Sequence, residues 1–262
     1  MTRAFMLEQL TLIELDPLAF IDVAERSGYD GIGLHMEGLS FPRSARYSLI
    51  EDQALRTAFG QRLTASGLKL HVIEPFVVTP ETDRDALRRN LDIAVILGAA
   101  VAGTLSFDPD ASRGADSMAM LSADAAERGL ALSIEPYYHS CLPTLSAAQT
   151  AARAAGASAG VTLDVLHVVR GDEHWSTMPD FDPALVRSVQ LSDGPLDAPE
   201  SRVAEAIADR SEPGDGAFDL ASLVPLLPDH LPIGIEVPQA NALLPPLERA
   251  IQLREKAVRL FT

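Results

Sequence analysis

Short runs rich in Val, Ile and Leu alternate along this chain with longer stretches rich in Ala, Leu and Arg, and this alternation restricts the fold most strongly. The apolar runs have the length of buried strands, and the longer stretches have the spacing of amphipathic helices. Parallel strands that are covered by helices on both faces are nearly continuously apolar. The pattern therefore predicts a series of βα units.

The strands are expected at residues 5–12, 31–35, 68–73, 101–107, 130–135, 160–164, 188–191 and 233–237, of which the first has the weakest pattern. The helices are expected at residues 17–27, 51–65, 82–97, 115–128, 146–155, 182–187, 220–227 and 246–260. Glycines at the ends of three of these helices, Gly67, Gly98 and Gly129, are typical helix stops. The chain thus alternates strand and helix from end to end.

Eight parallel strands in a chain of 262 residues favour a closed (β/α)8 TIM barrel of the α/β class over an open doubly wound sheet. No stretch is long enough to be a linker, so a single domain covering residues 1–262 is expected. The glycine-rich segment 212–216 lacks both the GxGxxG spacing and a following Lys-Ser/Thr pair. It is interpreted as a turn, not as a phosphate-binding loop.

Composition narrows the classes of function. The formal net charge is −16, which argues against a nucleic-acid partner, because binding phosphates needs clustered Lys and Arg. The one cysteine, Cys141, excludes an internal disulfide, favours a reducing compartment and is interpreted as structural. Residues 1–5 do not resemble a signal peptide, and the longest apolar stretch, 93–107, is shorter than the ~18 residues of a membrane span. A soluble cytoplasmic protein that does not bind membranes is expected.

Polar residues stand at or near the ends of the apolar strands, where the active site of a TIM barrel is built. They are His35, His71, Glu135, Asp164, Gln190 and Glu236. A carboxylate in such a place is costly to desolvate unless it is paired or binds a metal. A salt bridge is the more frequent explanation for each residue alone. Four consecutive strands that end in oxygen ligands, however, predict one divalent metal bound by Glu135, Asp164, Gln190 and Glu236.

Further side chains are candidates for contact with a substrate. His167, expected on the loop three residues after Asp164, either moves a proton and binds substrate or orients a carboxylate. His35 and His71 either line the opposite wall of the barrel mouth or are ordinary buried histidines. Arg210 either supplies charge to an anionic substrate or is a solvated surface residue. The oxygen-rich ligand set favours Mg²⁺, Mn²⁺ or Co²⁺ over Zn²⁺.

Nearly the whole chain resembles the xylose-isomerase-like barrel superfamily of sugar phosphate isomerases, epimerases and related lyases. The resemblance lies in five motifs, which are Ser133-Ile134-Glu135-Pro136, Leu163-Asp164-Val165-Leu166-His167, Val189-Gln190-Leu191-Ser192-Asp193, Pro213-Gly214-Asp215-Gly216 and Ile235-Glu236-Val237-Pro238. It implies that the four predicted ligands bind the metal and that His167 touches the substrate. It also suggests a homodimer.

Two departures separate the chain from the ketose epimerases of that superfamily. Those enzymes usually have a His where this chain has Gln190, and they carry a second catalytic Glu a few residues after the first ligand. The corresponding segment, 137–141, contains no acid. Gln190, and Arg210 ahead of a Pro-Gly-x-Gly turn, are similar to the bacterial 3-dehydroshikimate dehydratases of the same superfamily.

The leading hypothesis is a metal-dependent sugar (phosphate) isomerase or epimerase that acts on a small polyhydroxy carbonyl compound. The metal would stabilise the enediolate, Glu135 or Glu236 would serve as the base, and His167 would hold or move a proton. A dehydratase-type lyase is the first alternative, because loss of a proton beside a carbonyl also begins a β-elimination. A non-catalytic ligand-binding barrel is the second. A DNA-repair endonuclease of this fold is disfavoured by the six histidines and the negative charge.

Overall fold

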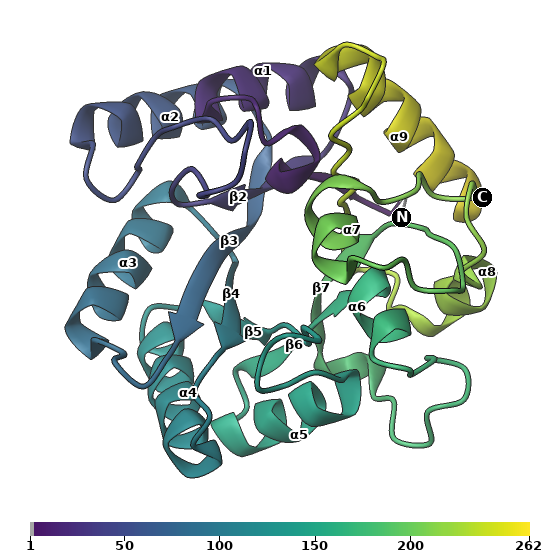
Figure 1. The fold of residues 1–262 in the computed structure, drawn as a ribbon. Helices are drawn as coiled ribbons and strands as arrows, with labels where there is room; N and C mark the ends of the chain where they lie inside the picture. Colours follow the sequence, from purple (N-terminus) through teal and green to yellow (C-terminus); the bar gives the residue numbers. More distant parts are fainter. Residues whose placement is uncertain (1–2) are drawn as a thin grey trace. The chain divides into compact units, whose positions relative to one another are not determined.

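The computed structural model describes residues 3–262, in which eight strands follow one another in the order β1 to β8 in a closed parallel barrel (Figure 1). The strands are β1 (Phe5–Glu8), β2 (Gly31–His35), β3 (Lys69–Val78), β4 (Val101–Ser106), β5 (Ala131–Ile134), β6 (Ala159–Asp164), β7 (Val186–Leu191) and β8 (Ile233–Ile235). This confirms the TIM barrel fold predicted from the alternation of strands and helices.

Helices lie between the strands in sequence. The α-helices are α1 (Pro17–Arg26), α2 (Gln53–Ser66), α3 (Arg84–Leu97), α4 (Ala111–Ala126), α5 (Leu145–Ala155), α6 (Val165–Arg170), α7 (Arg202–Ala208), α8 (Leu220–Leu223) and α9 (Pro246–Leu260). Short 3-10 helices are η1 (Gln9–Leu12), η2 (Pro183–Leu185) and η3 (Val224–Leu226). None of the helices formed by residues 3–262 has the length and apolar character needed to cross a membrane.

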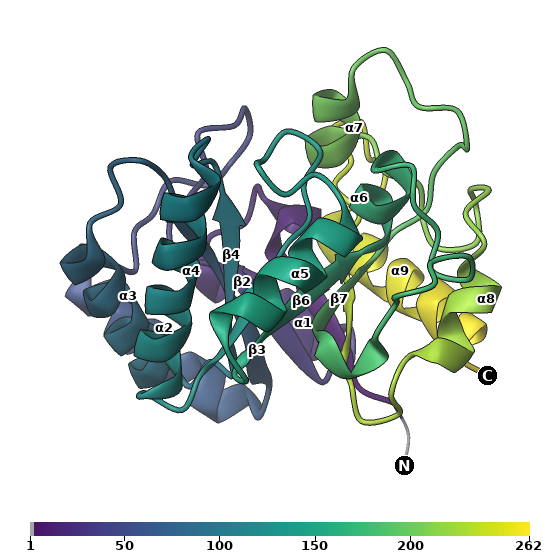
Figure 2. The same cartoon turned by 90° about the horizontal axis from the view of Figure 1, so that it is seen from below.

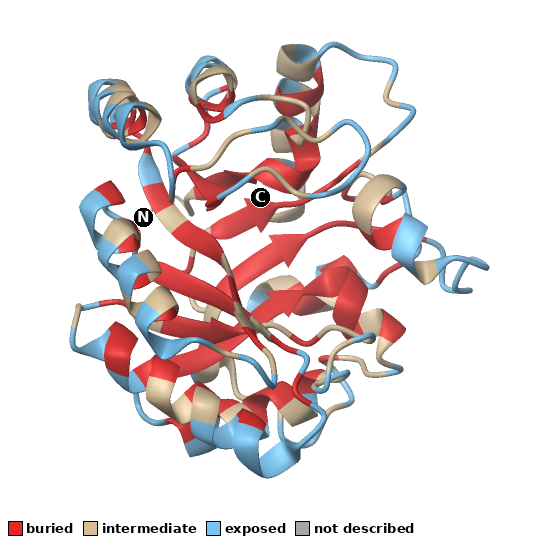
Figure 3. Ribbon diagram, turned by 60° about the vertical axis from the view of Figure 1, so that its left-hand side comes forward, coloured by how far each residue is buried: buried red, intermediate tan, exposed pale blue. Residues whose placement is uncertain are grey.

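The chain divides into two compact units. The first contains the described residues up to His71 together with Gln190–Thr262, and the second contains Val72–Val189. In the first unit β1 pairs with β2 and with β8, and Met6 is the Cα partner of both Gly31 and Gly234. The buried strands contrast with the exposed outer sides of the helices (Figure 3). In this unit α1 packs against α2 and α9.

In the second unit β4 pairs with β3 and β5, and β5 pairs with β6. Its helices cover the outside of these strands, and α4 packs against both α3 and α5 (Figure 2). The core side chains of this part include Leu132, Val161 and Leu163, which are fully buried. Parallel strands of this kind place all their carboxyl ends on one side of the sheet, where a TIM barrel builds its site.

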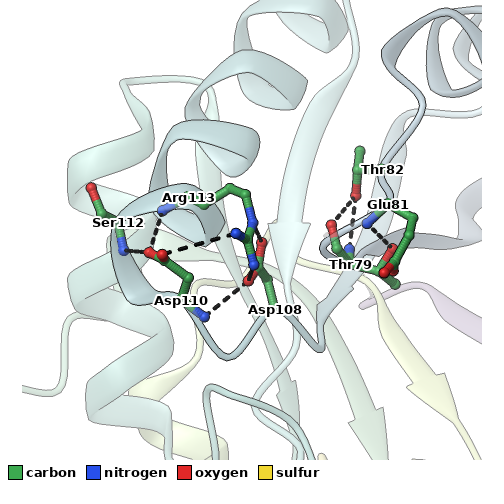
Figure 4. A network of polar contacts seen from close by, with 7 residues as sticks. All are labelled: Thr79, Glu81, Thr82, Asp108, Asp110, Ser112 and Arg113. Atoms are coloured by element: carbon green, nitrogen blue, oxygen red, sulfur yellow. Dashed lines mark hydrogen bonds and ion pairs between the residues drawn. The ribbon is translucent and has the colours of Figure 1, made fainter.

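Aspartate N-caps set where helices begin. Asp83 accepts hydrogen bonds from the N–H groups of Asp85 and Ala86, so α3 begins at Arg84. Asp110 accepts from the N–H groups of Ser112 and Arg113, and α4 therefore begins at Ala111, four residues before the predicted start (Figure 4).

The same segment holds an ion pair between the buried Asp108 and the half-exposed Arg113. Arg113 Nε and Nη2 donate to the two carboxylate oxygens of Asp108 at 2.7 and 2.6 Å (Figure 4). This hydrogen bonding from Arg113 keeps the pKa of Asp108 below its usual range. The loop after β4 is thus fixed by its own side chains. Cys141, interpreted as structural, is exposed, and its backbone N–H donates to the carbonyl of Ser106.

Several predicted boundaries are wrong for local reasons. The first strand stops at Glu8 because η1 begins there, and β3 continues to Val78, five residues beyond its predicted end. The predicted helix 182–187 is only the 3-10 turn η2, after which β7 starts. Helix 220–227 is split into α8 and η3, with Pro225 within η3. Helices α6 and α7 were not predicted.

Asp124 joins α4 to α3, and we expect its removal to destabilise the fold. The buried carboxylate accepts from Arg84 Nη2 at 2.8 Å and from Arg88 Nη1 at 2.7 Å. Bonding from Arg84 holds the pKa of Asp124 below its usual range. Asp124→Ala should lower the free energy of unfolding by about 2 kcal/mol. The variant loses the buried carboxylate that both arginines bond to, but the loss is moderate because both guanidinium groups are partly exposed and water can solvate them.

Urea denaturation measures this effect. Asp92→Ala is the control, because the exposed Asp92 carboxylate bonds to Arg128 at 2.7 Å and the loss of this surface ion pair should cost less than about 0.5 kcal/mol. Equal losses in the two variants would contradict the role assigned to Asp124.

Candidate metal and substrate site

Two carboxylates and an imidazole converge in the second unit, at the carboxyl ends of β5 and β6. Glu135, Asp164 and His167 each offer one ligand atom, and these atoms lie within 4.8 Å of one another. His167 Nε2 is 3.4 Å from Glu135 Oε1 and 3.7 Å from Asp164 Oδ2. The Asp164 side chain is fully buried and that of Glu135 is 14% exposed. Nitrogen and oxygen donors at this spacing are suitable ligands for a divalent cation.

The local fold explains these positions. Glu135 directly follows β5, and its N–H donates to the carbonyl of Thr104 in β4 at 2.9 Å. Asp164 is the last residue of β6 and the N-cap of α6, where its Oδ1 accepts from the N–H of His167 at 3.2 Å. Because the strand turns directly into a helix, His167 lies in the first turn of α6 and is buried, not in a loop as predicted.

Aromatic rings contact the His167 imidazole within the same unit. The ring of Tyr137 lies edge-on to it, with centroids 4.9 Å apart, and the Tyr138 ring lies 5.7 Å away. Contacts of this type restrict the orientation of the imidazole. The segment after Glu135, which lacks the acid expected of ketose epimerases, therefore supplies aromatic packing to His167.

In the first unit, Gln190 and Arg210 contact the carboxylate of Glu236. Gln190 Nε2 donates to Glu236 Oε1 at 3.3 Å, and Arg210 Nη2 lies 3.1 Å from Glu236 Oε2. All three residues are buried. Gln190 is the Cα partner of Gly234 in β8, and Glu236 directly follows that strand. The predicted ligands are therefore brought together in two pairs, Glu135 with Asp164 and Gln190 with Glu236, each within one unit.

Arg210 is buried and not a solvated surface residue. Its Nε donates to the carbonyl of Ala206 at 2.9 Å, and its backbone N–H donates to the carbonyl of Pro238. Gln239 Nε2 in turn donates to the carbonyl of Arg210 at 3.2 Å. These bonds hold Arg210 beside Glu236. Arg210 lies two residues after α7, a helix that was not predicted from the sequence.

Asp193 organises the glycine-rich turn. Its carboxylate accepts from the N–H groups of Gly194, Gly214 and Phe218 at 2.8, 3.0 and 3.0 Å. A Cβ on Gly216 would lie 2.2 Å from Asp193 Oδ1, so only glycine fits there. The segment is a turn, as predicted, and it closes on the carboxylate that follows β7.

His35 ends β2, as predicted, and belongs to a small polar cluster of the first unit. Burial lowers the pKa of His35 to about 4, so its imidazole is neutral near pH 7. The N–H of His35 donates to Gln9 Oε1 at 2.9 Å, and the Tyr47 hydroxyl donates to the same oxygen at 2.7 Å. Burial raises the pKa of Tyr47, so the hydroxyl keeps its proton.

His71 is not at a strand end. Because β3 continues to Val78, His71 is its third residue and lies near the amino end, away from the position predicted for it. Two buried acids that the sequence analysis missed are Glu8 at the end of β1 and Glu74 within β3. Each is a carboxylate in an apolar run, a pattern that can be seen in the sequence. Neither was noticed, because the first strand was predicted to end at residue 12 instead of Glu8 and the third at residue 73 instead of Val78. A Cβ on Gly103 would lie 2.7 Å from Glu74 Oε2, so this glycine leaves room for the carboxylate.

Residues 21–257 match the model of the xylose isomerase-like TIM barrel family, and the chain belongs to that family. This confirms the resemblance inferred from the strand-end motifs. No curated protein matches the chain in sequence.

Three solved structures with the same fold as this chain are described as proteins of different kinds. The IolI protein with a bound zinc atom has a TM-score of 0.80 at 15% identity, covering 98% of each chain. The "probable 3-DHS dehydratase AsbF" from Bacillus anthracis has a TM-score of 0.74 at 11% identity, covering 98% of each chain. D-allulose 3-epimerase from Methylomonas sp. has a TM-score of 0.69 at 17% identity, covering 99% of this chain and 96% of the other.

A larger protein also contains this fold. The chain covers 43% of a xylose isomerase-like TIM barrel/4-hydroxyphenylpyruvate dioxygenase fusion protein, and 99% of this chain matches it with a TM-score of 0.81 at 19% identity. At such identities these likenesses show the fold. The structures named above include one described as an epimerase and one described as a probable dehydratase.

Proposed function

We propose that the chain is a divalent-metal-dependent enzyme that removes a proton beside the carbonyl of a small polyhydroxy compound, with isomerisation or epimerisation as the outcome. The observation that carries this proposal is the convergence of Glu135, Asp164 and His167 within 4.8 Å. The buried carboxylate of Asp164 and the partly buried carboxylate of Glu135 repel at this spacing unless a cation or a proton lies between them. The zinc bound by the IolI protein of the same fold supports a metal here.

The proposed ligands are Glu135, Asp164, Gln190 and Glu236, with Mg²⁺, Mn²⁺ or Co²⁺ favoured over Zn²⁺ by the oxygen donors. When bound, the metal would supply Lewis-acid stabilisation of the negative charge that develops on the substrate as its proton leaves. The proton would be taken by Glu135 or Glu236. Glu135 is the more accessible of the two, since its side chain is 14% exposed and that of Glu236 is 4% exposed.

His167 would hold or relay the proton. Its Nε2 lies 3.4 Å from Glu135 Oε1, a separation that a small shift would bring into hydrogen-bond range. Tyr137 keeps the imidazole plane in place. A carboxylate and an imidazole that can exchange a proton are suited to moving it between two carbons or two faces of one carbon.

A dehydratase-type lyase is the second candidate. Gln190 in the ligand set and the buried Arg210 beside Glu236 favour it, since both features are similar to the 3-dehydroshikimate dehydratases. The first step, removal of a proton beside a carbonyl, is the same in both reactions. The products differ, so one experiment separates them.

The test is turnover by metal-stripped protein after addition of Mg²⁺, Mn²⁺, Co²⁺ or Zn²⁺. The substrates are D-allulose, a panel of other ketoses, their phosphates, and 3-dehydroshikimate, whose aromatic product absorbs in the ultraviolet. We expect metal-dependent conversion of a ketose. Metal-dependent formation of the aromatic acid alone would establish the lyase. A protein that binds metal yet converts none of these compounds would contradict the proposal and favour a ligand-binding barrel.

A further inference from the structure

Gln9 is held in one orientation by two hydrogen bonds to the same atom. The backbone N–H of His35 donates to Gln9 Oε1 at 2.9 Å, and the Tyr47 hydroxyl shares its one proton between Gln9 Oε1 at 2.7 Å and the carbonyl of His35 at 2.9 Å. A backbone N–H can only donate, so the amide oxygen must face His35, and the alternative flip of the amide is excluded. The amide nitrogen therefore points away from this pair of donors.

The two N–H donors of Gln9 Nε2 meet no acceptor within hydrogen-bond distance among residues 3–262, although the residue is only 3% exposed. Nε2 is not one of the fully buried atoms that lack a partner, so it still reaches solvent, and an oxygen of a bound ligand can take the place of water there. Gln149 in α5 is also buried, but both ends of its amide are bonded. Its Oε1 accepts from the backbone N–H of Asp182, and its Nε2 donates to the backbone carbonyl of Asp180.

The position of Gln9 links it to the proposed site. It is the first residue of η1 and directly follows β1, so it lies at a carboxyl end of the barrel strands. In the pairing of β1 with β8, Leu7 is the Cα partner of Ile235, which immediately precedes Glu236. Gln9 and Glu236 therefore follow the ends of neighbouring strands in the first unit.

We propose that Gln9 is a specificity-determining residue that donates from Nε2 to a hydroxyl, carbonyl or carboxylate oxygen of the substrate. This inference rests on the proposed function. An amide is a neutral donor, so it recognises an oxygen of a polyhydroxy compound without requiring a charged group. Its fixed orientation means that little side-chain freedom is lost on binding. The Tyr47 hydroxyl and the His35 N–H are the positioning groups.

The decisive variant is Gln9→Glu, assayed at pH 8 in the Mn²⁺-loaded protein. A carboxylate keeps an acceptor for Tyr47 and His35 but replaces the two free donors with an oxygen. We expect KM for the converted substrate to rise at least tenfold, with kcat changed less than threefold and the melting temperature nearly unchanged. Tyr47→Phe, which loosens the amide, should raise KM only a few-fold.

Gln149→Glu is the matched control. It also changes a buried glutamine by one atom, but it removes a satisfied donor, so it should lower the melting temperature and leave KM unchanged. Gln9→Met, which has no donor or acceptor, should reproduce the rise in KM even where Gln9→Glu folds poorly.

The probes are D-allulose and 3-dehydroshikimate, with binding followed by thermal stabilisation as well as by turnover. Wild-type protein that binds or converts a probe while Gln9→Glu and Gln9→Met do so equally well would overturn the role of Gln9 alone. If neither probe is bound or converted, the other ketoses and ketose phosphates of the panel replace them. Wild-type protein that binds and converts no compound of the whole panel would overturn the proposed function, and this inference with it.

Discussion

Replacing Asp164 by Ala is expected to abolish tight metal binding and to lower kcat/KM by roughly 10³-fold or more, since metal stabilisation of the transition state contributes several kcal/mol. Asp164 has the most restricted position of the proposed ligands, because it is fully buried and ends β6. It lies in one cluster with Glu135 and His167. Its loss removes both a proposed ligand and the N-cap of α6 that positions His167.

Loss of a buried aspartate could act through stability alone, and Asp193→Ala is the control for that. The Asp193 carboxylate is buried and accepts three backbone N–H groups, so its removal should lower the melting temperature. It should leave the number of bound metal ions per chain unchanged. Metal content and kcat/KM of the folded variants decide the matter. Full activity in Asp164→Ala would refute the proposed site.

Arg210→Ala should lower the free energy of unfolding of the metal-free protein by about 3 kcal/mol. The guanidinium is the cation found 3.1 Å from the buried Glu236 carboxylate, and removing one member of a buried pair leaves the other charge poorly compensated. A metal that binds Glu236 would compensate that charge. The rise in melting temperature on adding Mn²⁺ should therefore be larger in Arg210→Ala than in the wild type.

Arg249→Ala is the matched control, because Arg249 is also buried and pairs with Glu14 in the same unit at 2.5 Å. That pair contains none of the proposed ligands. The variant should be destabilised, but its response to Mn²⁺ should equal that of the wild type. An equal response in all three proteins would indicate that Glu236 does not bind the metal.

Much of the fold could be predicted from the sequence because buried parallel strands are nearly continuous apolar runs. Strand β2 has exactly the predicted bounds, and α9 does as well. The wrong boundaries lie where hydrogen bonds from individual side chains determine where a strand ends or a helix begins. The end of β6 at Asp164 was predicted, but the six residues after it were interpreted as a loop, because so short a helix shows no clear period and depends on the N-cap at Asp164.

The part of the candidate site that could be predicted from the sequence consists of the residues at strand ends. A carboxylate that ends an apolar strand is visible in the sequence, as Asp164 shows. The burial of Arg210 beside Glu236 depends on α7, and the orientation of Gln9 depends on Tyr47, 38 residues away. Contacts between residues so distant in the sequence leave no local pattern. His71 was misplaced because the end of β3 was predicted too early.

The most direct test of the metal site is a Mn²⁺ titration of metal-stripped protein, following free Mn²⁺ by electron paramagnetic resonance. We expect one tight site per chain, weakened at least tenfold by each of Glu135→Gln, Asp164→Asn, Gln190→Leu and Glu236→Gln, and unchanged by Asp193→Asn. Loss of binding in the Glu135 and Asp164 variants together with wild-type affinity in the Gln190 and Glu236 variants would contradict a site that needs all four residues.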